Sequence, residues 1–484
     1  MRSTSTVQRL SNLARKNRML SFLGLLCLLQ VAVLSSIRTG TSYDGAEQLL
    51  YTQNLEWGYG RSQPPLYTWL LIGIQQLFGV NQFSENLLKF SLLFALFVLM
   101  WRIALRLGFK AATASTIAAS PFLVIEIGWE VQRNYSHSVL LLALTAAFAL
   151  CYLRVQAVRS TAGYVALGLI FGLMLLTKYN AVLFVLALVV ADLIALRKGG
   201  VFRSWKAVAI PVIAAGLVTP HALWALDNAN HVLALTHKFA IAAPGNGIAA
   251  RAQGLLSFVI ACASILAIPA LMAGLHRGWT IAYPDPHGTK RVFVLWTTWA
   301  IAFGLVLVLV SGTTNVNVRW MLPLAIPALQ ILCGVVCDAE PRTDRHFKFL
   351  AITLAVLATA GQWIESWTDT RKGYDYGELM KVVAETTGAS EFLINDYAVL
   401  ANLRLYAPQV RVLNPVMPAA KSFPLNKPVM IWTGGNNRAD EMLRFARALG
   451  ACVAEPVPHA YTLNSRGHRH QLTVHYQALK TDCG

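Results

Sequence analysis

Long apolar runs separated by short polar segments make up the first three quarters of the chain. A hydrocarbon core of about 30 Å is crossed by about 20 apolar residues in a helix. Runs of about this length, almost free of charge, lie at 19–37, 87–106, 112–128, 136–153, 162–177, 180–196, 207–226, 254–275, 292–311, 320–337 and 347–364. The pattern predicts about 11 transmembrane helices, of which 112–128 and 162–177 are short for a span.

The pattern changes at about residue 365, where polar residues and proline become frequent. Short runs typical of strands lie at 391–395, 409–413 and 428–432, and a helical pattern at 438–449 stops before Gly450. Alternating strands and helices predict a compact α/β unit. We therefore expect an all-α polytopic membrane protein with two parts, a transmembrane domain over 1–364 and a small C-terminal α/β domain over 365–484.

Composition and charge predict how this membrane protein is oriented across the membrane. Of the 484 residues, 56% are hydrophobic and 13% charged, and the mean hydropathy is +0.50. Lysine and arginine gather in alternate loops, which are cytoplasmic in inner-membrane proteins. This places the N-terminus in the cytoplasm and the C-terminal domain in the periplasm of a bacterial inner (plasma) membrane. Basic loops against anionic headgroups account for the net charge of +18 without nucleic acid. The basic start lacks a cleavage site, which favours a retained first helix.

Seven cysteines add little chemistry to this picture. Five of them lie in the predicted spans, where cysteine behaves as a small apolar residue. Cys452 and Cys483 fall in the part assigned to the oxidising compartment, where disulfides form. The sequence leaves their pairing open.

Polar residues without a structural explanation gather in the predicted outer loops. The first outer loop, 38–86, is long, and its apolar stretch 66–78 is too short to span, which predicts a helix lying in the interface. Carboxylates and cations on one face suit a reaction that deprotonates a hydroxyl while neutralising a phosphate leaving group. The candidate residues in these loops are Asp44, Glu47, Arg61, Tyr67, Glu130, Arg133, His137, Lys178, His221 and Arg319.

Structural explanations stand beside these assignments. Asp44 with Glu47 three residues later is a capping-box pattern, and the cations are also placed to snorkel towards headgroups. His231 and His237 show no third ligand at a metal-like spacing, so a divalent metal stays open without a clear ligand set. A lipid or sugar transporter is the alternative function, although the chain shows neither an internal repeat nor charges deep in its spans. A binding or scaffold subunit also stays open.

Four segments in order resemble the GT-C glycosyltransferases. They are the acidic residue after the first span, Pro64-Pro65-Leu66-Tyr67-Thr68-Trp69, the Leu-Leu-Thr-Lys-Tyr segment ending at Tyr179, and Arg319-Trp-Met-Leu-Pro-Leu324. The similarity is to the branch of protein mannosyltransferases and aminoarabinose lipid A transferases, and most of all to the bacterial lipopolysaccharide galacturonosyltransferases. The tail segment 395–406 resembles the outer domain of that branch.

The resemblance implies a polyprenyl-phosphate-linked sugar donor. We expect the anomeric carbon to be attacked from the face opposite the phosphate, which makes the transfer inverting. The acceptor implied is lipopolysaccharide core, lipid A or another envelope glycan, and the sugar a uronic acid or a similar sugar. Carried across, Asp44 is the catalytic carboxylate, with Glu47 as a second candidate. The residues expected to bind the donor phosphate are Lys178, Arg319, Arg61 and Arg133. Those expected to bind substrate are Tyr67, Glu130, His137 and His221.

The sequence also departs from its relatives. Gly45 follows Asp44 where relatives often carry a second acidic residue, and Gln63 stands where the aminoarabinose transferases have lysine. The stretch 134–137 reads Asn-Tyr-Ser-His where many relatives place aspartate. A metal held by two aspartates is therefore not supported, and the phosphate charge must come from other cations.

Overall fold

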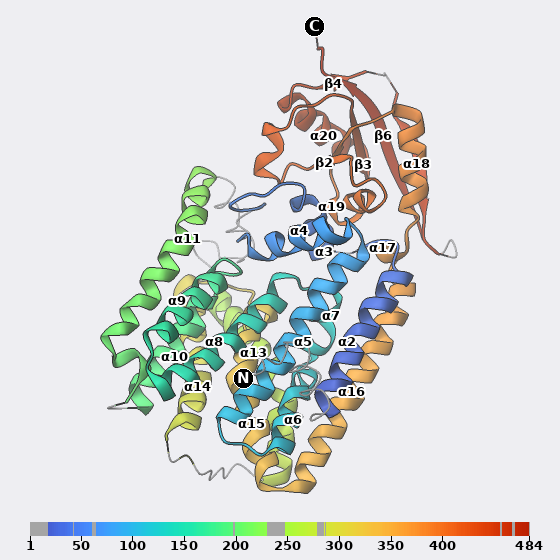
Figure 1. Cartoon of the computed structure of the whole chain (residues 1–484). Coiled ribbons are helices and arrows are strands. Elements are labelled where there is room, and N and C mark those ends of the chain that lie inside the picture. The colour runs from blue at the N-terminus through green and yellow to red at the C-terminus, as the bar shows by residue number, and fades with distance from the viewer. Residues whose placement is uncertain are drawn as a thin grey trace, which may run out of the picture.

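A helical bundle carries a smaller sheet domain on one of its ends, as Figure 1 shows. The computed structural model describes residues 18–41, 43–60, 64–196, 199–229, 247–277, 285, 287–454, 457–466 and 470–483. We call the end of the bundle beneath the sheet domain the domain end, and the other the opposite end. The predicted polytopic helical fold with a small C-terminal α/β part is confirmed.

Eight helices in the described part of the chain are long and apolar enough to cross a membrane. Their elements are α2 (Arg18–Ile37), α5 (Gln82–Arg106), α8 (His137–Val158), α11 (Ala209–Asp227), α13 (Gly247–Arg277), α14 (Thr289–Ser311), α15 (Ala325–Ala339) and α16 (Pro341–Thr368). Two shorter apolar helices, α9 (Thr161–Leu175) and α10 (Ala181–Ala195), match predicted runs to within two residues at each end. The predicted total of about 11 is reached only if both of these and one bent pair also cross.

The bent pair contains the predicted run 112–128 and extends to Arg133, which the prediction placed in the second outer loop. Helix α6 (Ala111–Ala119) continues into the 3-10 turn η1 (Ser120–Leu123), and Glu126–Arg133 then follow at 79° to it. Pro121 lies in η1, and the residues after the break form the π-helical turn η2 (Glu126–Glu130) followed by α7 (Val131–Arg133). Tight and wide helical turns disrupt the regular backbone ladder, which lets the chain change direction here.

The sheet domain begins with α17 (Thr370–Gly373) and α18 (Tyr376–Thr387). Its strands are β1 (Glu391–Ile394), β2 (Arg411–Leu413), β3 (Pro428–Thr433), β4 (Cys452–Val453), β5 (His459–Asn464) and β6 (Gln471–Lys480). Their order is β2-β1-β3-β6-β4, with β5 also paired to β6. The first three strands are parallel to one another, and β6 is antiparallel to its neighbours.

The sequence predicted β1, β2 and β3 to within two residues, and helix α20 (Asn436–Ala448) ends before Gly450, whose φ of +81° suits glycine. It missed β4, β5 and β6. Cys452 and Cys483 form a disulfide, with their Cα atoms 5.9 Å apart. The bond fastens the chain end beside β4.

The predicted helix at 66–78 is confirmed as α4 (Leu66–Phe78), and its position in the membrane interface stays a prediction. Both α4 and the shorter α3 (Asp44–Tyr51) lie between the bundle and the sheet domain (Figure 1). The apolar side of α3 is packed away from the bundle, because Ala46, Leu49 and Leu50 are buried in the same cluster as Leu400 of the sheet domain. The first loop thus contributes a helix to the core of the C-terminal domain.

Candidate active site

Asp44 is the first residue of α3 and lies at the domain end. Its Oδ2 accepts a hydrogen bond from the Ser136 amide at 3.3 Å, and its Oδ1 lies 3.6 Å from Nη1 of Arg319. No side chain caps α3 at Tyr43, so the capping box that the sequence allowed is not formed. The Asp44 carboxylate instead faces two segments of the bundle that are distant in sequence.

Three consecutive residues at the start of α8 connect Asp44 to the predicted phosphate site. Ser136 bonds to Asp44, as above. His137 Nε2 lies 3.3 Å from the side-chain nitrogen of Gln48, and Ser138 accepts a hydrogen bond from Nζ of Lys178 at 2.7 Å. Asp44 and Lys178 are therefore bonded to the first and the last residue of the stretch 136–138.

Arg319 is held from both sides of its short turn, η6 (Val318–Trp320). Asn317 caps the turn by accepting from the Arg319 amide at 3.1 Å, and Asn180 donates to the Trp320 carbonyl at 2.6 Å. The guanidinium also lies 5.8 Å from the ring centre of Tyr135. The Arg319 side chain keeps 32% of its surface exposed and that of Asp44 23%, so a ligand can reach both.

Tyr67 forms the buried floor beside this cluster. Its ring centre lies 5.4 Å from that of His137. Its hydroxyl has no hydrogen-bond partner among the described residues. Burial first, and then the charges of Glu85 and Asp44, raise the pKa of Tyr67 well above its usual value. The hydroxyl therefore stays protonated and can donate.

The remaining candidates lie in other contacts. Glu47 accepts from the hydroxyl of Tyr51 at 3.1 Å. Glu130 pairs with Arg133 at 3.3 Å. Arg61, together with His231 and His237, lies outside the described residues. Among those that are described, no group of three or more His, Cys, Asp or Glu side chains is arranged to hold a metal.

His221 joins the first loop to α11. Its Nδ1 lies 2.6 Å from the Trp57 carbonyl, which can only accept, so Nδ1 carries the proton. Its Nε2 lies 2.6 Å from the Tyr179 hydroxyl, which donates to it in the neutral imidazole. The Trp224 ring stacks on the imidazole, with ring centres 5.9 Å apart. His221 thus forms a latch between Trp57 and Tyr179, with both ring nitrogens in hydrogen bonds.

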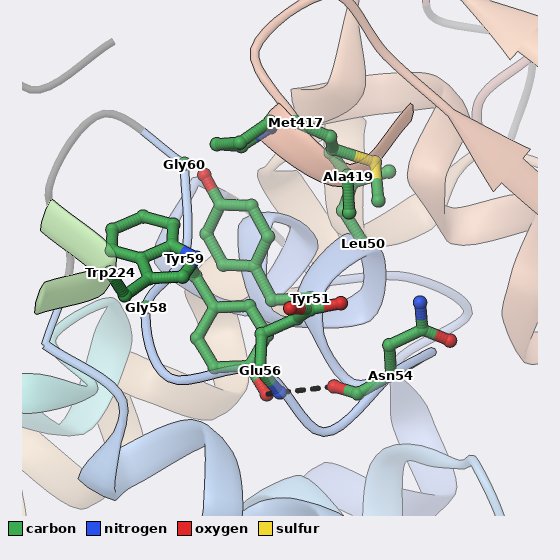
Figure 2. Close-up of a pocket in the computed structure, with 11 residues that line it drawn as sticks. Leu50, Tyr51, Asn54, Glu56, Gly58, Tyr59, Gly60, Trp224, Met417 and Ala419 are labelled. Carbon is green, nitrogen blue, oxygen red and sulfur yellow. Dashed lines mark hydrogen bonds between the residues drawn. The ribbon is translucent and has the colours of Figure 1, made fainter. Parts of the chain in front are cut away.

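A pocket opens between Trp224 of α11 and the sheet domain, as Figure 2 shows. Its aromatic walls are Tyr51, Tyr59 and Trp224, and Met417 closes it from the sheet domain. The Tyr59 hydroxyl donates to the Asn54 carbonyl at 2.7 Å and accepts from the Glu56 amide at 2.9 Å. These bonds fix the turn that follows α3.

Sequence reasoning missed a charge cluster centred on Glu365, at the domain end of α16. Its carboxylate pairs with Arg133 at 2.6 Å, with Arg38 at 4.0 Å and with Lys372. Burial and the neighbouring Arg38 lower the pKa of Lys372 to about 8, against the opposing effect of Glu365. The predicted phosphate ligand Arg133 is thus paired in this structure with Glu130 and Glu365.

Comparisons with known proteins find similar glycosyltransferases. The model of the dolichyl-phosphate-mannose-protein mannosyltransferase family matches residues 62–224. The chain is 24% identical over 406 residues to the lipopolysaccharide core galacturonosyltransferase RgtB of Rhizobium johnstonii, covering 81% of each protein. It is 25% identical over 433 residues to RgtA of the same organism, covering 84% of this chain and 86% of the relative.

Solved structures show the same fold. ArnT from Cupriavidus metallidurans bound to undecaprenyl phosphate superimposes with a TM-score of 0.63 at 14% identity, covering 94% of this chain and 97% of ArnT. The apo form of ArnT gives a TM-score of 0.60 at 13% identity, covering 95% and 98%. The resemblance to the GT-C glycosyltransferases is confirmed. The chain is a multi-pass membrane protein with the GT-C fold, and the catalytic assignments of single residues stay predictions.

Proposed function

We propose that this protein transfers a sugar from a polyprenyl-phosphate donor to a glycan of the bacterial envelope, with Asp44 as the catalytic carboxylate. The observation that carries the proposal is the convergence of Asp44, Arg319 and Lys178 around residues 135–138. These residues come from segments far apart in sequence. Their convergence supplies a base and two cations within one site, as transfer from a lipid phosphate requires.

The geometry suggests how the charges act. The Ser136 amide and Arg319 hold the Asp44 carboxylate, which orients an acceptor hydroxyl and removes its proton. The donor phosphate is a diester with one negative charge, and it gains a second charge as the bond to the sugar breaks, so its attraction to Arg319 and Lys178 grows during the transfer. Charge-assisted contacts of this kind stabilise the leaving phosphate most strongly in a site with little water. Attack from the face opposite the phosphate inverts the anomeric carbon.

We place the reaction on the periplasmic side of the inner membrane. The opposite end of the bundle carries the loop cations, with Lys110 beside Asp338 and Arg159 on the Gly200 carbonyl. Cations in short loops stay in the cytoplasm. This arrangement supports an external active site and an external sheet domain.

The relatives narrow the substrates. RgtA and RgtB are named as lipopolysaccharide core galacturonosyltransferases, and ArnT was solved with undecaprenyl phosphate. We take a hexuronic acid on undecaprenyl phosphate as the donor and lipopolysaccharide core or lipid A as the acceptor.

Two experiments test the function. Purified protein in vesicles, given undecaprenyl-phosphate-linked galacturonic acid and lipopolysaccharide, should form a glycosylated product and free undecaprenyl phosphate. Mass spectrometry of envelope glycolipids should show that one sugar disappears when the gene is deleted. Transport of the lipid-linked sugar across vesicles without any transfer would favour the transporter instead.

A further inference from the structure

The sheet domain holds the segment that contains Asp44. We call residues 39–41 and 43–53 the α3 segment. Asn402, which is completely buried, clasps the backbone of Thr41 on both sides. Its Oδ1 accepts from the Thr41 amide at 2.7 Å, and its Nδ2 donates to the Thr41 carbonyl at 3.0 Å. This pairing copies that between adjacent β-strands and fixes the position and the rotation of the backbone at Thr41.

The other end of the α3 segment is held in the same way. Nη1 of Arg404 donates to the Leu49 carbonyl at 2.7 Å and to the Thr52 hydroxyl at 2.8 Å. Gln53 forms two bonds with the backbone of Val412 on β2, at 2.7 and 2.8 Å. Both termini of α3 are therefore fastened to the sheet domain.

The backbone between these points is strained. Tyr43, directly before Asp44, has a φ of +39°, in a region that bulky residues seldom adopt. Such a conformation persists only where the surroundings enforce it. Asn402 acts two residues before Tyr43, and the Arg371 guanidinium stacks on the Tyr43 ring at 4.4 Å. Both restraints come from the C-terminal part of the chain.

We propose that Asn402 is a positioning residue, through which the sheet domain sets the Asp44 carboxylate against Ser136 and Arg319. This inference rests on the proposed function of Asp44. A catalytic group that moves by about 1 Å loses up to about a hundredfold in rate. The proposed phosphate ligands Lys178 and Arg319 belong to the bundle, where Ser138 binds Lys178 and Asn317 caps the turn of Arg319, so Asn402 fastens neither of them directly. Loss of Asn402 should therefore lower kcat and leave the KM for the donor nearly unchanged.

Asn414 provides a matched control. It is equally buried, and its Nδ2 donates to the Ile394 and Asn395 carbonyls at 2.8 and 2.9 Å, while its Oδ1 accepts from the Val416 amide. All of these bonds lie within the sheet domain. Asn402→Ala and Asn414→Ala should cost similar thermal stability, whereas only Asn402→Ala should lower kcat, by about tenfold or more.

Hydrogen exchange tests the clasp without the reaction. In Asn402→Ala, the amides of residues 41–53 should exchange faster than in the wild type, and in Asn414→Ala they should not. Tyr406→Phe is the milder variant if Asn402→Ala does not fold, because it removes only the hydroxyl that donates to the Thr39 carbonyl at 2.8 Å. It should raise exchange in the same segment.

The outcomes are separable. If the wild type transfers no sugar, the proposed function fails, and the exchange result still decides the clasp. If the wild type is active and Asn402→Ala keeps the kcat of Asn414→Ala, the positioning role is overturned. Unchanged exchange at 41–53 in both Asn402→Ala and Tyr406→Phe also overturns it.

Discussion

Arg319 and Asp44 face each other across the domain end of the bundle, with Nη1 and Oδ1 3.6 Å apart. The two residues carry opposite tasks in the proposed reaction, because one receives a proton and the other neutralises a phosphate. At 3.6 Å and with both side chains partly exposed, the pair contributes little to stability. Its value is to keep both groups oriented until a donor phosphate draws the arginine away.

Asp44→Asn should abolish most transfer while the protein stays folded. The amide keeps the size of the side chain and can still accept from the Ser136 amide, but it cannot take a proton from the acceptor. Transfer should fall at least about a hundredfold, the scale of general base catalysis. Rates from purified donor lipid, with thermal stability in parallel, provide the measurement.

Asp344→Asn is the matched control for that variant. Asp344 lies at the opposite end of the bundle, where it pairs with Lys348 at 3.1 Å and accepts from Thr116 at 2.5 Å. Its amide variant should transfer at the wild-type rate. Near-normal transfer by Asp44→Asn would remove Asp44 from the chemistry.

Lys178→Gln and Arg319→Gln should each raise the KM for the donor and lower kcat. The reason is that a cation on the leaving phosphate contributes to binding the donor and, more strongly, to the transition state. Exchanging one cation for the other should restore only part of the rate, since arginine offers a planar fork and lysine a point charge. Lys348→Gln, at the opposite end, should leave both constants unchanged.

A cation that only snorkels would behave differently, because any long side chain would then serve. Unchanged kinetics in both Gln variants would move the phosphate site elsewhere, with Arg61 and Arg133 as the next candidates. For Arg133, release from Glu130 and Glu365 would then be required first.

A reporter fused after residue 484 should be active only if it functions in the periplasm. The expected orientation follows from the cations at the opposite end of the bundle. It requires an odd number of crossings, because each crossing reverses the side, and the eight long helices together with α9, α10 and the bent pair 111–133 give 11. A reporter that works only in the cytoplasm and is active at this position would place the sheet domain and Asp44 inside the cell. That result would contradict the proposed periplasmic reaction.

The sequence predicted the parts that depend on local pattern and missed those that depend on distant contacts. Apolar runs identified the helices and α4, because burial in lipid or at its surface selects residues along a single segment. The order of short motifs identified Asp44, Lys178 and Arg319 as candidates. Nothing local showed that Asn402 clasps Thr41, since the two are 361 positions apart and asparagine is common in loops.

The cluster at Glu365 shows the same limit. In the sequence, a single glutamate near the end of an apolar run indicates only that a helix ends there. Arg38 and Lys372 likewise look like ordinary cations at the membrane interface. Only the fold reveals that the three meet. Among the missed elements, β4 has two residues and β5 is largely exposed, so neither leaves a strong alternating pattern.

Glu365→Gln should destabilise the junction between the bundle and the sheet domain. The side chains of Lys372 and Arg38 are 0% and 2% exposed, so removing the central carboxylate leaves buried cations short of a partner. Losing one member of a buried pair costs about 3–5 kcal/mol, and the remaining contact of Lys372 with Asp369 at 3.6 Å should keep the loss near the lower end. Thermal unfolding in detergent measures it. Glu441→Gln is the control.

The control pair, Arg438 with Glu441, lies on the surface with side chains 60% and 46% exposed, and breaking it should cost less than about 1 kcal/mol. A second change gives the sharper result. If the cost of Glu365→Gln comes from stranded charge, then adding Lys372→Met should recover part of the lost stability, because the methionine removes a buried cation and keeps most of its volume. If the cost comes from packing alone, the two changes should simply add. Additive losses would therefore contradict a charge cluster at this junction.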